Sequence, residues 1–139
     1  MSSVYFDTSA FVKILVEEPG SVSAVRAWHA ADSVVGSRLL PAEARAALAM
    51  ARRQRRLTDS QHVRAKAALA NHWQSMFVVE VTEPVVDEAG ELAEQEALRG
   101  FDAVHLASAR RAAVDVLITA DAEMIRAARA HGLKVIDAR

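Results

Sequence analysis

The chain has 139 residues, 52% of them hydrophobic and 25% charged, with five glycines and three prolines. This composition excludes disordered, collagen-like and low-complexity chains, and the length suits one domain over residues 1–139 that buries roughly 68% of its unfolded surface. The formal net charge is −1, and the absence of cysteine excludes disulfides, thiolate nucleophiles and cysteine-ligated zinc. No apolar run approaches the roughly 18 residues of a membrane span and no basic segment precedes the first one, so we expect a cytoplasmic protein without membrane contact.

Strands and helices alternate along the predicted chain. In order, we expect a strand at 4–6, helices at 10–18 and 21–31, a strand at 34–35, helices at 41–56 and 59–73, a strand at 77–81, a helix from 84 that stops at 100, a helix at 102–113, a strand at 114–119, a helix at 121–130 and a strand at 133–136. The strands are almost continuously apolar, which is typical of a parallel sheet covered on both faces. The pattern predicts an α/β fold, a three-layer α/β/α sandwich with a parallel twisted sheet of four to five strands.

Four acidic residues stand at corresponding places in this pattern. Asp7 and Asp121 directly follow strands, Glu43 lies in the first turn of the helix after the second strand, and Asp102 begins the helix after Gly100. In parallel sheets the ligand crevice lies beyond the carboxyl ends of the strands. Taken singly, each acid is better explained as a helix cap, which contributes about 0.5–2 kcal/mol. As a group they are expected to share one rim of the sheet.

Four carboxylates in one cleft would repel one another at neutral pH unless a cation shared them. Oxygen ligands without cysteine favour Mg²⁺ or Mn²⁺ over zinc. A carboxylate-held divalent ion can orient a phosphodiester, acidify a water and neutralise charge in the transition state. The group of acids therefore predicts metal-assisted phosphodiester hydrolysis.

Four short segments carry a family resemblance that covers essentially the whole chain. In the order FDTSA at 6–10, PAE at 41–43, GFDAVHLASA at 100–109 and ITAD at 118–121, they resemble the PIN-domain ribonucleases, specifically the VapC-like toxins of type II toxin–antitoxin pairs. The resemblance implies an endoribonuclease that requires Mg²⁺ or Mn²⁺ and leaves 5′-phosphate and 3′-hydroxyl ends. It also implies a cognate antitoxin that docks across the groove, and a homodimer.

The resemblance assigns roles to individual side chains. It implies that Asp7, Glu43, Asp102 and Asp121 form the catalytic and metal-binding cluster, with Asp7 and Asp102 as principal ligands and the other two completing the site directly or through water. Ser9 and Thr119 would stand beside the cluster. Their hydroxyls could orient Asp7, a ligand water or a substrate phosphate.

A basic segment follows the second acid. Residues 41–72 hold seven cations against two acids, whereas residues 77–100 hold seven acids against one arginine. Such a block can attract a polyanion although the whole chain is nearly neutral. The candidates for RNA binding are Arg45, Arg52, Arg53, Arg55 and Arg56. A solvated helix end explains them equally well.

Two other interpretations of the fold and the role of one histidine remain open from the sequence. His105 lies one turn beyond Asp102, where a packed or hydrogen-bonded histidine is favoured over a general base or ligand. A non-catalytic PIN-like binding module is an alternative, but it would be expected to lack the acids. A phosphoacceptor-type α/β signalling domain would normally carry an acidic pair after the first strand, whereas Thr8 follows Asp7 here.

Overall fold

A five-stranded parallel sheet, in the order β3-β2-β1-β4-β5, organises the computed structural model, which describes residues 2–139. Each strand is short, and neighbouring strands pair in parallel register, as Phe6 with Ile118. The prediction of a parallel sheet of four to five strands is therefore confirmed. The strands are β1 (Ser3–Phe6), β2 (Ser33–Ser37), β3 (Phe77–Val79), β4 (Val116–Thr119) and β5 (Lys134–Asp137).

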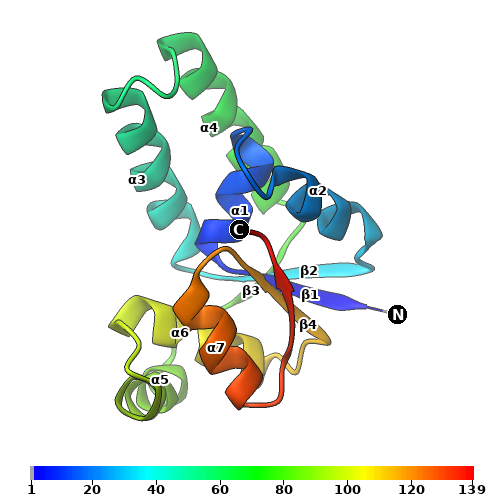
Figure 1. Cartoon of the computed structure of the whole chain (residues 1–139), viewed down its shortest axis with the longest axis vertical. Helices are drawn as coiled ribbons and strands as arrows, with labels where there is room; N and C mark the ends of the chain where they lie inside the picture. Colours follow the sequence, from blue (N-terminus) through cyan, green and yellow to red (C-terminus); the bar gives the residue numbers. More distant parts are fainter. Residues whose placement is uncertain (1) are drawn as a thin grey trace.

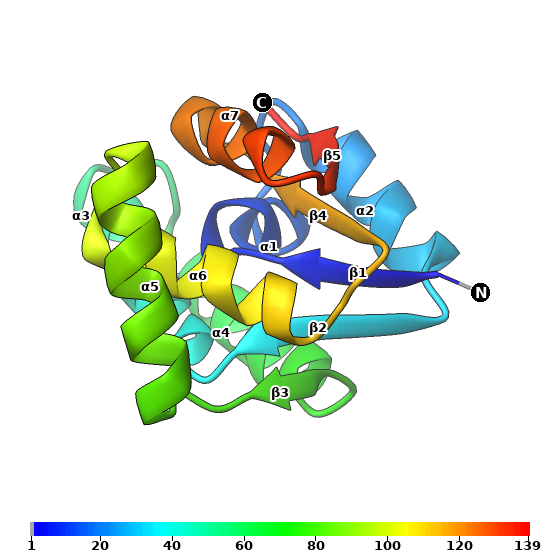
Figure 2. The ribbon, with the colours of Figure 1, turned by 90° about the horizontal axis from the view of Figure 1, so that it is seen from below.

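Helices cover both faces of the sheet, which confirms the predicted three layers (Figures 1 and 2). One face carries α1 (Thr8–Leu15), α2 (Ser21–Ala30), α3 (Leu40–Arg53) and α4 (Asp59–Trp73), and the other carries α5 (Glu83–Glu96), α6 (Gly100–Arg111) and α7 (Ala122–Ala130). None of the helices formed by residues 2–139 combines the length and apolar character needed to cross a bilayer.

Side-chain alternation along the strands builds two hydrophobic cores. Phe6 and Ile118 point into the core beneath α1 to α4, whereas Tyr5 and Leu117, their neighbours in sequence, point into the core beneath α5 to α7. Successive strand residues face opposite sides of a sheet, so a strand buried on both faces is apolar at every position. This double burial is the physical reason for the continuous apolar runs in the sequence.

Two predicted elements differ from the observed ones. The helix expected to run from Pro84 to Gly100 ends at Glu96 because Ala97 adopts a left-handed conformation with φ 55°, and Gly100 begins α6 instead of stopping α5. The strand predicted as buried at 77–81 is only Phe77–Val79, and Phe77 is 65% exposed. Because β3 pairs only with β2 and lies at the edge of the sheet, its side chains are less covered than those of central strands.

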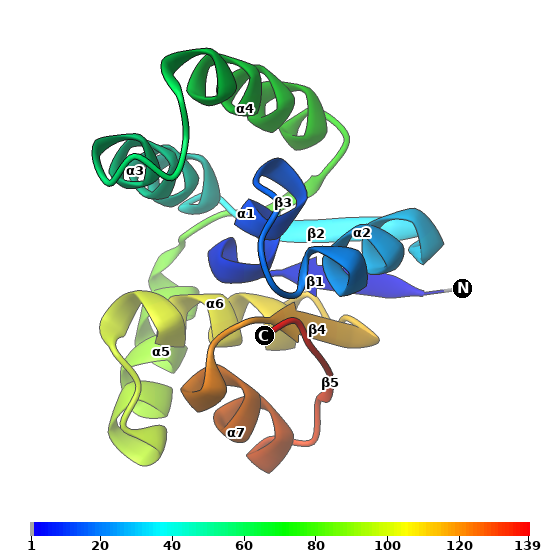
Figure 3. The same ribbon diagram turned by 45° about the horizontal axis from the view of Figure 1, so that its top comes forward.

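Helices α3 and α4 form an antiparallel pair that projects beyond the sheet (Figure 3). Their connection follows Arg53, and the capping box of Thr58 and Gln61 starts α4. The start of α3 lies next to the carboxyl end of β2, whereas its last turn lies at the far end of the projection. This arrangement separates Glu43 from the arginine-rich end of the same helix.

Candidate active site

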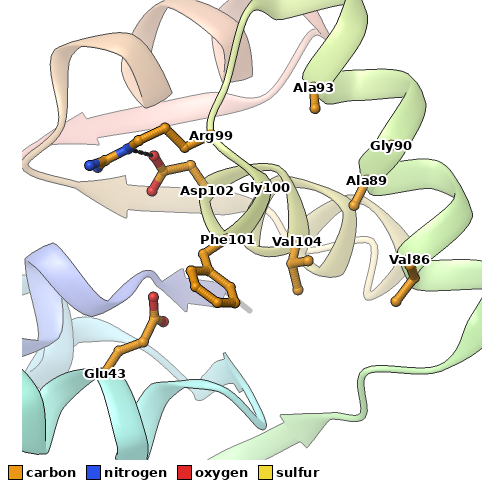
Figure 4. A pocket seen from close by; sticks show the side chains of 10 residues that line it. All are labelled: Glu43, Val86, Ala89, Gly90, Ala93, Arg99, Gly100, Phe101, Asp102 and Val104. Atoms are coloured by element: carbon orange, nitrogen blue, oxygen red, sulfur yellow. Dashed lines mark hydrogen bonds and ion pairs between the residues drawn. The ribbon is translucent and has the colours of Figure 1, made fainter.

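The carboxyl ends of the central strands bring the four predicted acids to one edge of the sheet. Asp7 follows β1 and caps α1, and Asp121 follows β4 and caps α7. Glu43 lies in the first turn of α3 and Asp102 in the first turn of α6. Both side chains line one cavity of about 550 Å³, on opposite sides of it (Figure 4). Asp7 and Asp121 thus act as helix caps and also lie at the same edge of the sheet as the other two acids.

Asp7 is the buried member of the group, with 4% of its surface exposed. One carboxylate oxygen accepts the Ser9 hydroxyl at 2.7 Å and the Ala10 amide at 3.0 Å, and the other accepts the Thr119 hydroxyl. Burial raises the pKa of Asp7, although the nearby His105 and these hydrogen bonds act in the opposite direction. An ionised Asp7 is thus costly in this setting, and a bound cation would relieve that cost.

Ser9 and Thr119 connect Asp7 to the segment that carries Asp121. The Ser9 hydroxyl accepts the Ala120 amide at 2.9 Å, and the Thr119 hydroxyl accepts the Asp121 amide at 3.1 Å. Each hydroxyl also donates to Asp7. The two residues join Asp7 to the backbone of Asp121, the first and last of the four predicted acids, in one network beside the cluster.

Glu43 is held by a second network that reaches the core. Its carboxylate accepts the Thr8 hydroxyl at 2.8 Å and lies 2.6 Å from His105 Nε2, while the Tyr5 hydroxyl lies 2.8 Å from His105 Nδ1. Partial burial by itself would raise the pKa of Glu43, but His105 and Thr8 together hold it below the usual value. His105 is 2% exposed, so it is a hydrogen-bonded core histidine that fixes Glu43, as favoured from the sequence.

Arg99, which was not among the residues predicted from the sequence, contacts two of the acids. Its Nε donates to Asp102 Oδ2 at 3.0 Å (Figure 4), and its Nη2 lies 3.9 Å from Asp121 Oδ2. The spacing of three residues between Arg99, the N-cap of α6, and Asp102 in its first turn was a signal for this pair. The contact with Asp121 had no signal in the sequence.

The donor set fits a hard divalent ion, since four carboxylates and two hydroxyls gather at one rim. In the arrangement described for residues 2–139, however, no three Asp, Glu or His side chains are placed so as to hold one ion together. The physical reason is visible in the contacts: Glu43 is hydrogen-bonded to His105, and Asp102 and Asp121 are drawn to Arg99. Arg99 is thus a protein cation that lies against two of the acids in addition to the divalent ion expected from the sequence.

Four of the five candidate RNA-binding arginines lie apart from the four predicted acids. Arg52 lies nine positions after Glu43 in α3, which corresponds to about 14 Å along the helix. Arg52, Arg53 and Arg55 are exposed at the end of the α3–α4 projection, whereas Arg56 approaches Glu18 at 3.9 Å. Arg45 lines a separate hollow between α3 and α4. Four of these cations therefore lie away from the carboxylate rim, whereas Arg56 lines a hollow together with Thr8, Ser9 and Ala120 beside Asp7.

Comparison with known proteins gives one family. The PIN domain model matches residues 4–130. Ribonuclease VapC45 of Mycobacterium tuberculosis is 43% identical over 141 residues, which covers 100% of this chain and 98% of the relative.

Two solved structures share the fold at low identity. One is the sarcin-ricin loop cleaving toxin VapC20 of M. tuberculosis, with a TM-score of 0.69, 19% identity, and coverage of 94% of this chain and 95% of that one. The other is VapBC-5, a member of the VapBC family of toxin-antitoxin systems from the same organism, with a TM-score of 0.68, 18% identity and 99% coverage of both chains. From the fold, the rim of acids and the match over the whole chain, we conclude that this protein belongs to the PIN domain family and, within it, to the VapC ribonucleases.

Proposed function

We propose that the chain is an endoribonuclease that requires Mg²⁺ or Mn²⁺ and acts as the toxin of a toxin–antitoxin pair. The observation that carries the proposal is that Asp7, Glu43, Asp102 and Asp121 lie at one edge of a parallel sheet, at the carboxyl ends of its strands. The VapC ribonuclease relative supports the substrate class. Action on RNA implies a cytoplasmic location.

The proposed reaction is hydrolysis of a phosphodiester. The oxygen of water attacks phosphorus, the bond to the 3′-oxygen breaks, and the products carry a 5′-phosphate and a 3′-hydroxyl. One proton leaves the water and one is taken up by the departing 3′-oxygen. A bound divalent ion supplies charge neutralisation and a lower pKa of the attacking water.

The residues of the chain prepare this chemistry. Asp7 and Asp102 would hold the ion as principal ligands, and Glu43 and Asp121 would complete the set directly or through water. Ser9 and Thr119 fix the orientation of the Asp7 carboxylate through their hydroxyls. Glu43 is oriented by His105, whose own ring is anchored in the core. Fixed carboxylates favour catalysis because their reorganisation does not have to occur during the reaction.

Chelation of divalent metal is expected to stop RNA cleavage. Purified protein is incubated with end-labelled single-stranded RNA in Mg²⁺ or Mn²⁺, and with excess EDTA. We expect cleavage only in the first two samples and recovery when Mn²⁺ is returned to the third, because the ion neutralises charge on the reacting phosphate. EDTA already saturated with Mg²⁺ is the control for the chelator itself. Cleavage that persists in EDTA would contradict the metal-dependent mechanism.

The arginines at the end of the α3–α4 projection are proposed to bind the RNA backbone at phosphates that lie at a distance from the reacting one. Replacing Arg52, Arg53 and Arg55 together by glutamine is expected to weaken RNA binding and to make the slope of log K against log salt shallower by about 2, since each phosphate contact to single-stranded RNA contributes about 0.7. The measurement is fluorescence anisotropy of labelled RNA over a salt series.

A matched triple variant controls for net charge. Arg110, Arg111 and Arg129 lie in the last turns of α6 and α7, at the opposite edge of the sheet from the acids. Their replacement by glutamine removes the same charge and should leave the salt slope unchanged. Equal slopes for the two triple variants would assign the effect to overall charge and reject a binding site at the end of the projection.

A cognate antitoxin and a second copy of the chain are the proposed protein partners. The shared fold with a VapBC toxin-antitoxin member supports the first of these. We expect growth to stop when the chain is expressed alone and to recover when a cognate small antitoxin is expressed with it. Normal growth on expression of the intact chain alone would count against the toxin assignment.

A further inference from the structure

Arg99 contacts two of the four carboxylates that are proposed to bind the metal. It is the residue immediately before α6, its side chain is 85% exposed, and its guanidinium contacts both Asp102 and Asp121. These two acids come from different elements, and Arg99 is the cation that joins them. One protein charge is thus placed against two carboxylates of the proposed metal site.

Helix stability does not explain this placement. The N-terminal end of a helix carries a partial positive charge, so a cation at that position is disfavoured and an acid is favoured. An exposed ion pair between residues three apart contributes little to folding. The reach to Asp121, on another element, adds nothing to α6. The effect of Arg99 is therefore to balance the negative charge of Asp102 and Asp121 and not to stabilise α6.

Arg99 and a divalent ion compete for the same oxygen atoms. Asp102 Oδ2 accepts the guanidinium, and Asp121 Oδ2 faces it. When a carboxylate oxygen coordinates a dication, its ion pair with a nearby arginine is weakened, because the two cations repel each other. Because Arg99 is mostly exposed, its contacts are screened by water and can be exchanged at low cost.

We infer that Arg99 is the resident counter-cation of the acid cluster: it balances Asp102 and Asp121 before metal binds, is displaced by the divalent ion, and then contacts the phosphodiester of the RNA. The inference rests on the proposed nuclease function and deepens it. A guanidinium released at the rim is suited to the phosphate because its planar fork of donors matches two phosphate oxygens. The same side chain thereby serves the site before and after the metal binds.

The test separates metal binding from catalysis. Mn²⁺ binding to the full, metal-stripped chain is measured by titration calorimetry for the wild type, Arg99→Gln, Arg99→Lys and Arg111→Gln. Arg111 is the matched control, because it lies at the other end of α6 and pairs with Glu88 at 3.8 Å. We expect Mn²⁺ to bind about three- to tenfold more tightly to Arg99→Gln, in line with the loss of two weak ion pairs. Arg99→Lys and Arg111→Gln should bind like the wild type.

Cleavage kinetics at saturating Mn²⁺ test the second half of the inference. For Arg99→Gln we expect the KM for RNA to rise about tenfold, although metal binds more tightly, whereas a merely structural pair would move neither quantity. Unchanged or weaker Mn²⁺ binding by Arg99→Gln overturns the counter-cation role, and an unchanged KM overturns the phosphate contact. A wild-type chain that binds no Mn²⁺ would instead refute the proposed function, so the two failures are distinguishable.

Discussion

Replacement of Asp7 by asparagine is expected to lower RNA cleavage at saturating Mg²⁺ by at least about 10³-fold, because metal charge stabilisation contributes several kcal/mol and each 1.36 kcal/mol is a factor of ten in rate. Asp7 is the buried acid on which Ser9 and Thr119 converge. Asparagine keeps the shape and an acceptor oxygen but loses the negative charge. Cleavage of labelled RNA by the purified variant measures the effect, and an activity within tenfold of wild type would contradict the assignment of Asp7 as a ligand.

The same variant should fold at least as stably as the wild type near neutral pH when metal is absent. Burial raises the pKa of Asp7 above the value of 3.8 that describes the unfolded chain. The folded state therefore binds the proton more tightly, and this contribution to stability is complete below pH 3.8 and is lost as the pH rises through the raised pKa. The asparagine side chain has no proton to lose in this range, so the Asp7→Asn variant escapes that loss.

Chemical denaturation in EDTA at several pH values measures this difference. We expect the free energy of unfolding of Asp7→Asn relative to wild type to increase between acid and neutral pH. Asp59→Asn is the control, since Asp59 is an exposed acid in the first turn of α4, outside the site. A relative stability of Asp7→Asn that falls with rising pH would contradict the burial argument. Together the two measurements separate a lost ligand from a lost fold.

Replacement of His105 by alanine is expected to reduce the free energy of unfolding by about 3 kcal/mol and cleavage by at least tenfold. The stability loss combines a cavity in the core with a lost hydrogen bond to the fully buried Tyr5. The activity loss follows because Glu43 loses the partner that lies 2.6 Å from its carboxylate. Thermal or chemical denaturation measures the first effect, and cleavage well below the melting temperature measures the second.

Two further variants separate the positioning of Glu43 from general destabilisation. Tyr5→Phe removes the hydroxyl and keeps the ring, so it should cost about 1 kcal/mol of stability and leave cleavage nearly unchanged. His105→Gln keeps an amide donor that can reach Glu43, so we expect it to recover part of the activity lost in His105→Ala. If the alanine variant cleaved like the wild type while folded, His105 would be a packing residue without influence on Glu43.

The order of elements and the place of the acids could be predicted from the sequence, for two physical reasons. Strands covered on both faces are apolar at every position, so they stand out from the amphipathic helices around them. In a parallel sheet all carboxyl ends point to one edge, so residues such as Asp7 and Asp121, each placed just after a strand, were expected to share a rim. No distances were needed for either inference.

Element ends and strand positions depended on tertiary context. Gly100 was expected to stop a helix, but the left-handed backbone at Ala97 ends α5 and Gly100 starts α6. Phe77 was expected in a buried strand, yet its strand lies at the sheet edge. A local pattern cannot specify these features, because strand order and helix packing are set by contacts between distant segments.

Periodicity along the chain was enough to predict the α/β architecture, and the order of the motifs was enough to name four candidate acids and, through the family resemblance, two neighbouring hydroxyls. The partners of those acids, in contrast, come from contacts between segments that are distant in the sequence. Thr8 and His105 hold Glu43, and Arg99 joins Asp102 to Asp121 across two elements. The charge state of such a rim depends on distances of a few ångströms between side chains remote in sequence, because Coulomb interactions and burial both change steeply over that range.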